Sequence, residues 1–455
     1  MNKAILAEIQ QALGGSLAEQ AIPEETGTGA LPSVYAVTDL ASAAIASAGM
    51  AVAEFIATRS GKRPHIQVDR RLASMWFASS VRPIGWQLPQ PWDAIAGDYK
   101  ARDTWIRLHT NAPHHRRAAL QVLGCSEERE AVAQAVAAWQ ANELEQAIVA
   151  AKGCAAVMRS IEDWRRHEQG RAVEAEPLLH VSSTDSGRVP NWPISKQRPL
   201  EGIRVLDLTR VLAGPVATRF LAGYGAQILR IDPIDWEEPG VVPEVILGKR
   251  CARLDLKRAA GLATLKRLLA DADILVHGYR TDALIQLGLG PEERRKLRPG
   301  LVDISLNAYG WSGPWQMRRG FDSLVQMSSG IAEAGMVQAN KPHPFPLPVQ
   351  ALDHATGYLL ASAAVRGLTR RVINGQGLEV RASLARTAAL LTRYPVENGL
   401  AARIEPEKQA DLDPTIEETA WGAAQRLKPA LIIDGCPIRW NLPATHLGTS
   451  AAEWI

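Results

Sequence analysis

One aspartate at the start of a long helix pattern is the residue in this chain best suited to covalent chemistry. Asp353 is followed by a run rich in alanine, glycine and leucine, which ends in the basic pair Arg370–Arg371 and a glycine turn at 375–377. A carboxylate is a weak nucleophile, but it can attack a thioester and so divide one difficult acyl exchange into two easier steps. The N–H groups and dipole of a helix start are expected to stabilise its ionised form. The simplest structural role for the same residue is a helix cap.

The same pattern occurs a second time near the N-terminus. At an offset of 314 residues, Asp39 aligns with Asp353 and Gly61 aligns with Gly375. We interpret this as an internal repeat, and the alternative is two similar alanine-rich helices. The first copy lacks the Thr–Gly pair that follows Asp353, so Asp39 is expected to be a structural cap.

From Leu200 onward, short apolar strands alternate with helix patterns, which predicts a parallel, doubly wound sheet. The loop Val211, Leu212 and Ala213 follows the first strand and would lie at the carboxyl end of the sheet, where such sheets bind ligands. Gly223–Tyr224–Gly225 follows a helix, so it does not form a dinucleotide-binding phosphate loop. The expected elements are strands at 203–208, 227–231, 274–276 and 301–306, and helices at 216–222, 258–270 and 291–298.

Three sequence blocks, in order and followed by the Asp353 helix, carry a family resemblance. They read PLEGIRVLDLTRVLAGPVATRFLAGYGAQILRIDP, GKRCARLDLKRAAG and LVDISLNAYGWSGPWQMRRGFDSLVQMSSG. Together they resemble the family III CoA-transferases, the formyl-CoA transferase and carnitine CoA-transferase family, in a permuted or partly duplicated form. An earlier segment, WIRLHTNAPHHRRAALQVLG, is similar to the small domain of that family.

The resemblance implies a CoA-transferase that moves CoA between an acyl-CoA and a carboxylic acid. Asp353 would be the catalytic nucleophile and would form an aspartyl covalent intermediate. Coenzyme A and acyl-CoA would be substrates, with no tightly bound cofactor and no metal. CoA carries phosphates and an adenine, so its site needs cations and apolar surface. The implied CoA-binding residues are Val211, Leu212, Ala213, Lys249, Arg250, Tyr279 and Arg280.

Two other functions are compatible with these residues. The α-methylacyl-CoA racemases share the fold and move the α-proton with a histidine and an aspartate. The position of their histidine is Phe321, which cannot move a proton, and His354 points away from its neighbour Asp353 on a helix. A non-catalytic CoA-binding protein is the third class, because Gly278 replaces the family's asparagine and the stretch 232–249 is short.

The expected fold class is α/β, with a Rossmann-like doubly wound parallel sheet domain and a small α/β domain. Family members are interlinked dimers. Here we expect either a homodimer or a pseudo-dimeric monomer with one site, built by the C-terminal half and covered by residues 96–180. The expected segments are the N-terminal helix and first Asp-helix copy (1–95), the small domain (96–181), a linker (182–198), the CoA-binding half (199–346), the second copy (347–402) and a tail (403–455).

Bulk composition narrows the class of protein further. A net charge of +3 gives no reason to expect a nucleic-acid partner. The four cysteines lack CxxC spacing, and the His-His-Arg-Arg cluster at 114–117 is expected to be a solvated helix start and not a metal site. The first 15 residues predict an amphipathic helix, and no apolar run is expected to reach a membrane span of roughly 18 residues. A cytoplasmic protein with small-molecule acyl-CoA and carboxylate partners is predicted.

Overall fold

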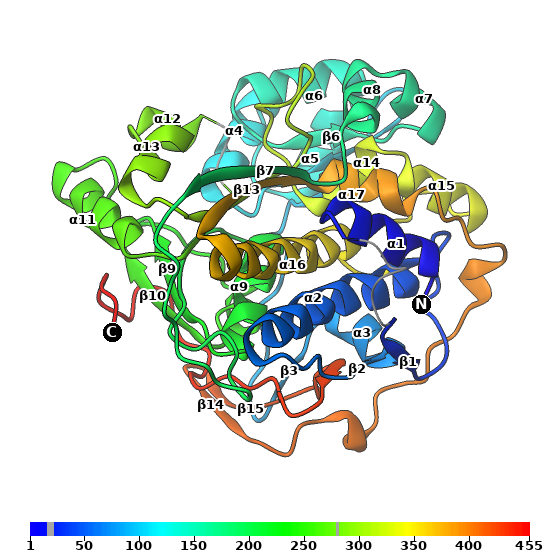
Figure 1. Cartoon of the computed structure of the whole chain (residues 1–455). Helices are drawn as coiled ribbons and strands as arrows, with labels where there is room; N and C mark the ends of the chain where they lie inside the picture. Colours follow the sequence, from blue (N-terminus) through cyan, green and yellow to red (C-terminus); the bar gives the residue numbers. More distant parts are fainter. Residues whose placement is uncertain (16–21, 279–281) are drawn as a thin grey trace.

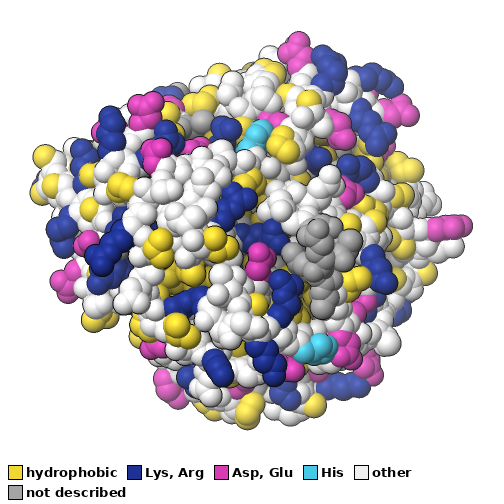
Figure 2. All heavy atoms as spheres, viewed as in Figure 1, with side chains coloured by type: hydrophobic (Ala, Val, Ile, Leu, Met, Phe, Trp, Pro, Cys, Tyr) yellow, Lys and Arg dark blue, Asp and Glu magenta, His cyan; other side chains and the backbone are white. Residues whose placement is uncertain are grey.

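The computed structural model describes residues 1–15, 22–278 and 282–455. Tyr279 and Arg280, two of the predicted CoA contacts, lie outside the described residues. A large α/β unit surrounds two long helices, and a smaller unit packs against it at the top of the view in Figure 1. Basic and acidic side chains are interspersed on the face shown in Figure 2, in keeping with the small net charge.

The largest sheet of the described residues has seven strands in the order β10-β9-β8-β11-β12-β13-β7. Six are parallel, and β7 is antiparallel to β13. The predicted α/β class with a parallel sheet is therefore confirmed. The chain winds outward from β8 to β10 and then continues on the other side of β8 at β11, so the direction of winding changes between β8 and β11. The strands are β7 (His180–Ser186), β8 (Arg204–Leu208), β9 (Gln227–Asp232), β10 (Lys249–Arg253), β11 (Ile274–His277), β12 (Val302–Asn307) and β13 (Gln376–Ser383).

Strand β7 corrects the expected linker at 182–198. The polar residues at the start of that stretch form the edge of the main sheet, paired with β13. An edge strand exposes much of its surface to solvent, so polar side chains are stable there and no apolar alternation marks it in the sequence.

Two 24-residue helices, α2 (Val37–Ser60) and α16 (Ala351–Asn374), pack side by side in the centre of the large unit (Figure 1). They run parallel, because Ser47 bonds Ser362 and, two turns further on, Glu54 pairs with Arg366. Alanine and other small residues dominate the contact, which allows a close approach of the two helix axes.

The expectation that no segment could reach a membrane span is wrong for α2. By length and composition this helix could cross a membrane. In the structure, however, 83% of its most apolar stretch is buried inside the protein. It therefore packs as a core helix of this fold.

The remaining elements of the large unit surround this centre. The main sheet is flanked by α9 (Ala213–Gly223), α10 (Val242–Val245), α11 (Ala259–Ala270), α12 (Ala283–Gln286), α13 (Pro291–Leu297), α14 (Asp322–Ser328), α15 (Ile331–Gln338) and α17 (Leu384–Leu391). The N-terminal and C-terminal parts supply α1 (Lys3–Ala12), α3 (Arg70–Trp76), and two small sheets made of β1 (Glu24–Thr26), β2 (Ile66–Asp69), β16 (Leu431–Ile433) and of β14 (Glu417–Thr419), β15 (Gly422–Arg426), β3 (Val81–Pro83).

The small unit has its own sheet and apolar core. Two helices form within residues 128–151, because the N–H of Ala141 donates to the carboxylate of Asp103 and a new helix starts at that point. The unit docks on α14, where the N–H of Arg159 donates to the carbonyl of Met327. Its elements are β4 (Gly97–Lys100), β5 (Trp105–Leu108), β6 (Ala155–Val157), α4 (Pro113–Leu123), α5 (Arg129–Ala137), α6 (Ala141–Ala150), α7 (Ile161–Arg166) and α8 (Glu168–Ala175).

Candidate active site

Asp353 is the third residue of α16, and the helix cap is Gln350. Asp353 is therefore not the cap that its position in the sequence first suggested. A second carboxylate performs that function, because Asp322 Oδ2 accepts the N–H groups of Leu352 at 2.9 Å and of Asp353 at 3.0 Å. Asp322 is the first residue of α14, so two helix starts meet here and bring two carboxyl groups together.

The two carboxyl groups do not share their proton equally. Burial raises the pKa of Asp353 well above its usual value, and the negative charge of Asp322 raises it further. Burial also raises the pKa of Asp322, to about 6, although N–H donors from Gln326 and the α16 backbone oppose the shift. Among the described residues no hydrogen bond reaches the Asp353 carboxyl, so the anion resides on Asp322 and the proton on Asp353. The expectation that the helix start keeps Asp353 ionised is thus wrong for the free protein.

The small unit reaches this site through a histidine. His109 follows β5, and its ring stacks on Phe321 with 3.6 Å between ring centroids and 7° between planes. Phe321 immediately precedes Asp322, so residues of the small unit lie one residue away from the carboxyl pair. Burial lowers the pKa of His109 well below its usual value, which keeps the ring neutral.

The loop after β8 lies against α16 and is held in a strained conformation. Val211 has a φ of 64°, a left-handed backbone conformation that is rare for a β-branched residue. Its N–H donates to Glu238 Oε2 at 2.9 Å. A Cβ at Gly357 would lie 2.5 Å from the carbonyl oxygen of Ala213, so the glycine allows α16 to pack directly on this loop. The structure therefore brings the predicted loop and the Asp353 helix together.

Lys249 and Arg250, predicted to bind CoA, both make contacts within the chain. Lys249 is buried, and its Nζ lies 3.1 Å from Asp207 Oδ2 and 2.9 Å from the carbonyl of Pro215. Burial lowers the pKa of this ammonium to about 8, against the attraction of Asp207. Arg250 donates to the carbonyl of Glu453 in the C-terminal segment. The Lys249 ammonium thus joins Asp207, near the end of β8, to Pro215, near the start of α9.

A group of cations near the same loop was missed by sequence reasoning. Burial lowers the pKa of His114, and the nearby positive charges of Arg319, Arg117 and Arg210 lower it further. The Arg319 guanidinium also donates to the carbonyl of Lys152. The expected solvated helix start at 114–117 is therefore part of a basic cluster that three separate segments build. Their spacing along the chain gives no signal of this cluster, because it forms only when the small unit docks.

Comparison with known proteins finds matches over part of the chain. Residues 200–421 match the model of CoA-transferase family III. This match, together with relatives named as CoA-transferases, supports the predicted resemblance over that segment.

Named relatives match over similar stretches. Succinyl-CoA:glutarate CoA-transferase of Mus musculus is 30% identical over 233 residues, which are 48% of this chain and 53% of the relative. The probable fatty acyl-CoA transferase Rv3272 of Mycobacterium tuberculosis is 31% identical over 192 residues, 39% of this chain and 48% of the relative. A crystal structure of Rv3272 is 29% identical and covers 49% of this chain and 61% of that chain with a TM-score of 0.40. The chain spans about half the length of the curated relatives it matches.

Proposed function

We propose that this protein is a CoA-transferase that moves CoA from an acyl-CoA to a carboxylic acid through a covalent intermediate on Asp353. The observation that carries the proposal is the position of Asp353. It lies at the start of α16 beside Asp322, and Gly357, about one turn further along the same helix, packs on the loop after β8. Relatives with transferase names support the same class.

The reaction would proceed by two exchanges at one carboxyl group. The Asp353 carboxylate attacks the thioester carbonyl, its C–S bond breaks, and a mixed anhydride and CoA thiolate form. The thiolate then attacks the Asp353 carbonyl carbon, the donor acid leaves as a carboxylate, and CoA remains on the enzyme as a thioester. An acceptor carboxylate reverses these steps and leaves with the CoA.

The protonated state of Asp353 sets a condition on the first step. Only the carboxylate is nucleophilic, so Asp353 must lose its proton before or during thioester binding. With a raised pKa, the ionised fraction of Asp353 grows as the pH rises. We therefore expect the rate of acyl-enzyme formation to increase with pH toward the alkaline side. Replacing the neighbouring charge in Asp322→Asn should move this rise to lower pH.

The CoA site is proposed at the change in winding between β8 and β11, where open parallel sheets bind ligands. Val211, Leu212 and Ala213 would contact CoA directly, and Tyr279 and Arg280, which lie outside the described residues, remain predicted contacts. Lys249 would act through Asp207 and the start of α9, since its ammonium is already bonded there. Arg250 lies on β10, two strands from β8, and remains a predicted CoA contact. The basic cluster of His114, Arg117, Arg210 and Arg319 would supply cations for the CoA phosphates.

We also propose that one chain reproduces the arrangement of a dimer with a single working site. The bounds of α2 and α16 differ by the same 314 residues at both ends, and both helices end at a left-handed glycine. Contacts between them join nearly equivalent positions, such as Ser47 and Ser362, as an interface with two-fold symmetry would. We interpret the sheet as Rossmann-like and the two helices as an internal repeat. A cytoplasmic location is proposed from four unpaired cysteines.

Intact-mass measurement after incubation with acyl-CoAs tests the reaction. The set would start with succinyl-CoA and include a long-chain acyl-CoA, each with and without hydroxylamine. Wild type and the control Asp39→Ala should gain a hydroxylamine-labile adduct, and Asp353→Ala should gain none. An adduct on Asp353→Ala would place the nucleophile elsewhere. Bound CoA without an adduct on any variant would favour a non-catalytic CoA-binding protein.

A further inference from the structure

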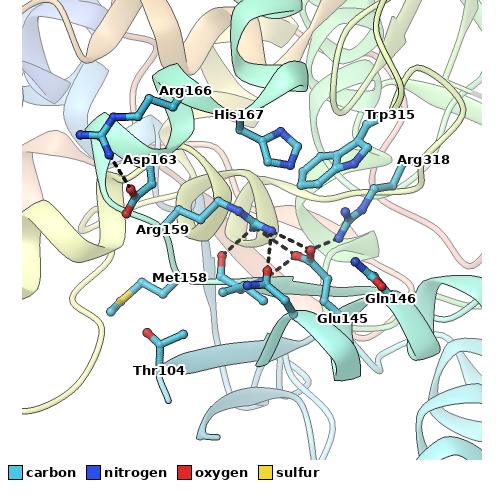
Figure 3. Close-up of a pocket in the computed structure, with 12 residues that line it drawn as sticks. Thr104, Glu145, Gln146, Met158, Arg159, Asp163, Arg166, His167, Trp315 and Arg318 are labelled. Carbon is cyan, nitrogen blue, oxygen red and sulfur yellow. Dashed lines mark hydrogen bonds and ion pairs between the residues drawn. The ribbon is translucent and has the colours of Figure 1, made fainter. Parts of the chain in front are cut away.

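A cavity of about 600 Å³ lies between the small unit and the loop that leads to Phe321. Figure 3 shows its lining, in which Glu145 of α6 lies between Arg159 and Arg318, and Asp163 and Arg166 of α7 lie together on the side away from Trp315. It has the volume typical of sites for small organic molecules. None of its lining residues belongs to the carboxyl pair or to the loop after β8. The lining residues are Thr104, Asn142, Glu145, Gln146, Val157, Met158, Arg159, Asp163, Arg166, His167, Trp315 and Arg318.

The cavity lining is rich in charged groups. It holds three guanidinium groups, from Arg159, Arg166 and Arg318, and two carboxylates, and Glu162 outside the lining also pairs with Arg166. One of these carboxylates, Glu145, is already used, because it accepts from Arg159 and pairs with Arg318 at 3.1 Å. Burial would raise the pKa of Glu145, but Arg318 and Arg159 hold it below its usual value, so it stays ionised as a fixed internal counter-charge.

Hydrogen-bond donors are left over on the cavity wall. Asn142 Oδ1 accepts from Arg159 at 3.2 Å, so its NH₂ group remains as the unused end of the amide. His167 Nδ1 accepts the N–H of Gln169 at 3.1 Å. Burial and the charge of Arg159 lower the pKa of His167, so the ring is neutral and carries its proton on Nε2. Arg166 is 72% exposed at the rim and makes only surface pairs, with Glu162 and Asp163.

A further part of the wall is formed by the flat ring of Trp315 and by the apolar side chains of Val157 and Met158. The Arg318 guanidinium lies 3.9 Å from the centroid of the Trp315 ring, and the Arg159 guanidinium lies 5.2 Å from it. Val157 and Met158 of the β6 strand and its end complete this side. Both guanidinium groups lie over the Trp315 ring, and the part of the indole that lines the cavity would contact the apolar body of a negatively charged ligand.

We propose that this cavity is a second ligand site, which binds a small organic carboxylate with an aromatic or apolar body. The carboxylate would bond the Asn142 amide, the His167 Nε2–H and Arg166, and the body would lie on Trp315. The site is separate from Asp353, but the two are joined by one short segment, since Arg318 of the cavity lies four residues before Asp322. The proposal does not rest on CoA transfer, because its test measures binding alone.

Isothermal titration calorimetry of the full chain with phenylacetate and its neutral amide, phenylacetamide, tests the site. Phenylacetate should bind and the amide should bind at least about tenfold more weakly, because the charge is the recognised feature. Asn142→Asp keeps the acceptor for Arg159 and replaces the donor by a negative oxygen, so it should weaken phenylacetate binding by about tenfold or more. Equal binding of acid and amide, or wild-type affinity in Asn142→Asp, would overturn the proposal.

Two matched variants make the result specific. Arg166→Gln should weaken binding by about two- to fivefold, since the side chain is exposed and screened. Arg165→Gln, the neighbouring exposed arginine outside the lining, should leave it unchanged. Asp353→Asn should also leave binding unchanged. If Asp353→Asn abolished phenylacetate binding, the probe would be shown to occupy the carboxyl-pair site, and the second site would be rejected whatever the fate of the transferase proposal.

Discussion

The starts of α2 and α16 have nearly the same backbone and very different surroundings. The residue before each helix has φ and ψ of −72° and 58° at Ala36 and of −74° and 61° at Gln350, and each helix carries an aspartate as its third residue. Asp39 has a side chain that is 28% exposed and 3.6 Å from the cation of Arg70. Asp353 is buried beside the carboxylate of Asp322. The two helix starts therefore give their aspartates the same backbone position. The neighbouring residues determine the burial and the charge around each carboxyl group, and so whether that group can take part in chemistry.

The largest effect expected from this comparison is on CoA transfer. Asp353→Asn should lower the rate of the proposed CoA transfer from an acyl-CoA to a carboxylic acid by about a thousandfold or more, because the proposed intermediate forms on the Asp353 carboxylate. Asp39→Asn, the matched change in α2, should alter it by no more than about twofold. The rate of formation of the product thioester, followed by chromatography, measures both. A large loss in Asp39→Asn would show that both helix starts are needed for the reaction.

A second difference should appear in stability as a function of pH. The folded protein keeps the Asp353 proton at pH values where the unfolded chain, with the ordinary value of 3.8, has lost it. Protons are then bound more tightly in the folded state, so the free energy of unfolding falls as pH rises above that value. Each unit of pKa difference corresponds to about 1.4 kcal/mol.

Asp353→Asn removes this titration and should gain stability over wild type between pH 5 and pH 8. Asp39→Asn should not gain in this way, because its exposed pair with Arg70 contributes at most about 1 kcal/mol. Urea unfolding at the two pH values compares the three proteins. A gain that is the same at pH 5 and pH 8 would contradict a buried proton on Asp353.

The smallest expected effect concerns packing at equivalent positions. Gly357 of α16 corresponds to Ala43 of α2, and a Cβ at Gly357 would collide with the carbonyl of Ala213. Gly357→Ala should therefore destabilise the protein by about 1–3 kcal/mol and displace the loop after β8. Ala43→Gly should cost about 1 kcal/mol, through helix propensity alone. Denaturant midpoints measure both, and equal costs would mean that the loop does not depend on the glycine.

Much of the main sheet could be predicted, because its strands are buried on both faces and therefore read as apolar runs. The runs at 203–208, 274–276 and 301–306 agree with β8, β11 and β12 to within one residue at each end. Strand β7 could not be found in this way, since an edge strand tolerates polar residues. The two Asp-bearing helices were predicted with the correct glycine ends.

The sequence indicated that the Asp353 helix and the loop after β8 belong to one site, but it did not indicate the electrostatics of that site. Asp322 lies 31 residues before Asp353, and the contact between them depends on how α14 packs against α16. For the same reason the sequence could not show that Lys249 is buried against Asp207. The same residue pattern occurs whether a lysine near a strand start faces solvent or pairs with a carboxylate. Charge partners across elements are properties of packing, and spacing along the chain does not encode them.

The packing of α2 on α16 within one chain also determines how substitutions can accumulate at the contact between them. In an assembly of two identical subunits, every substitution appears on both sides of the interface at once. Here a substitution in α2 leaves α16 unchanged, and the contact between them does not weaken on dilution, because both helices belong to one molecule. One helix start could therefore lose its reactive surroundings while the other kept a buried pair of carboxyl groups.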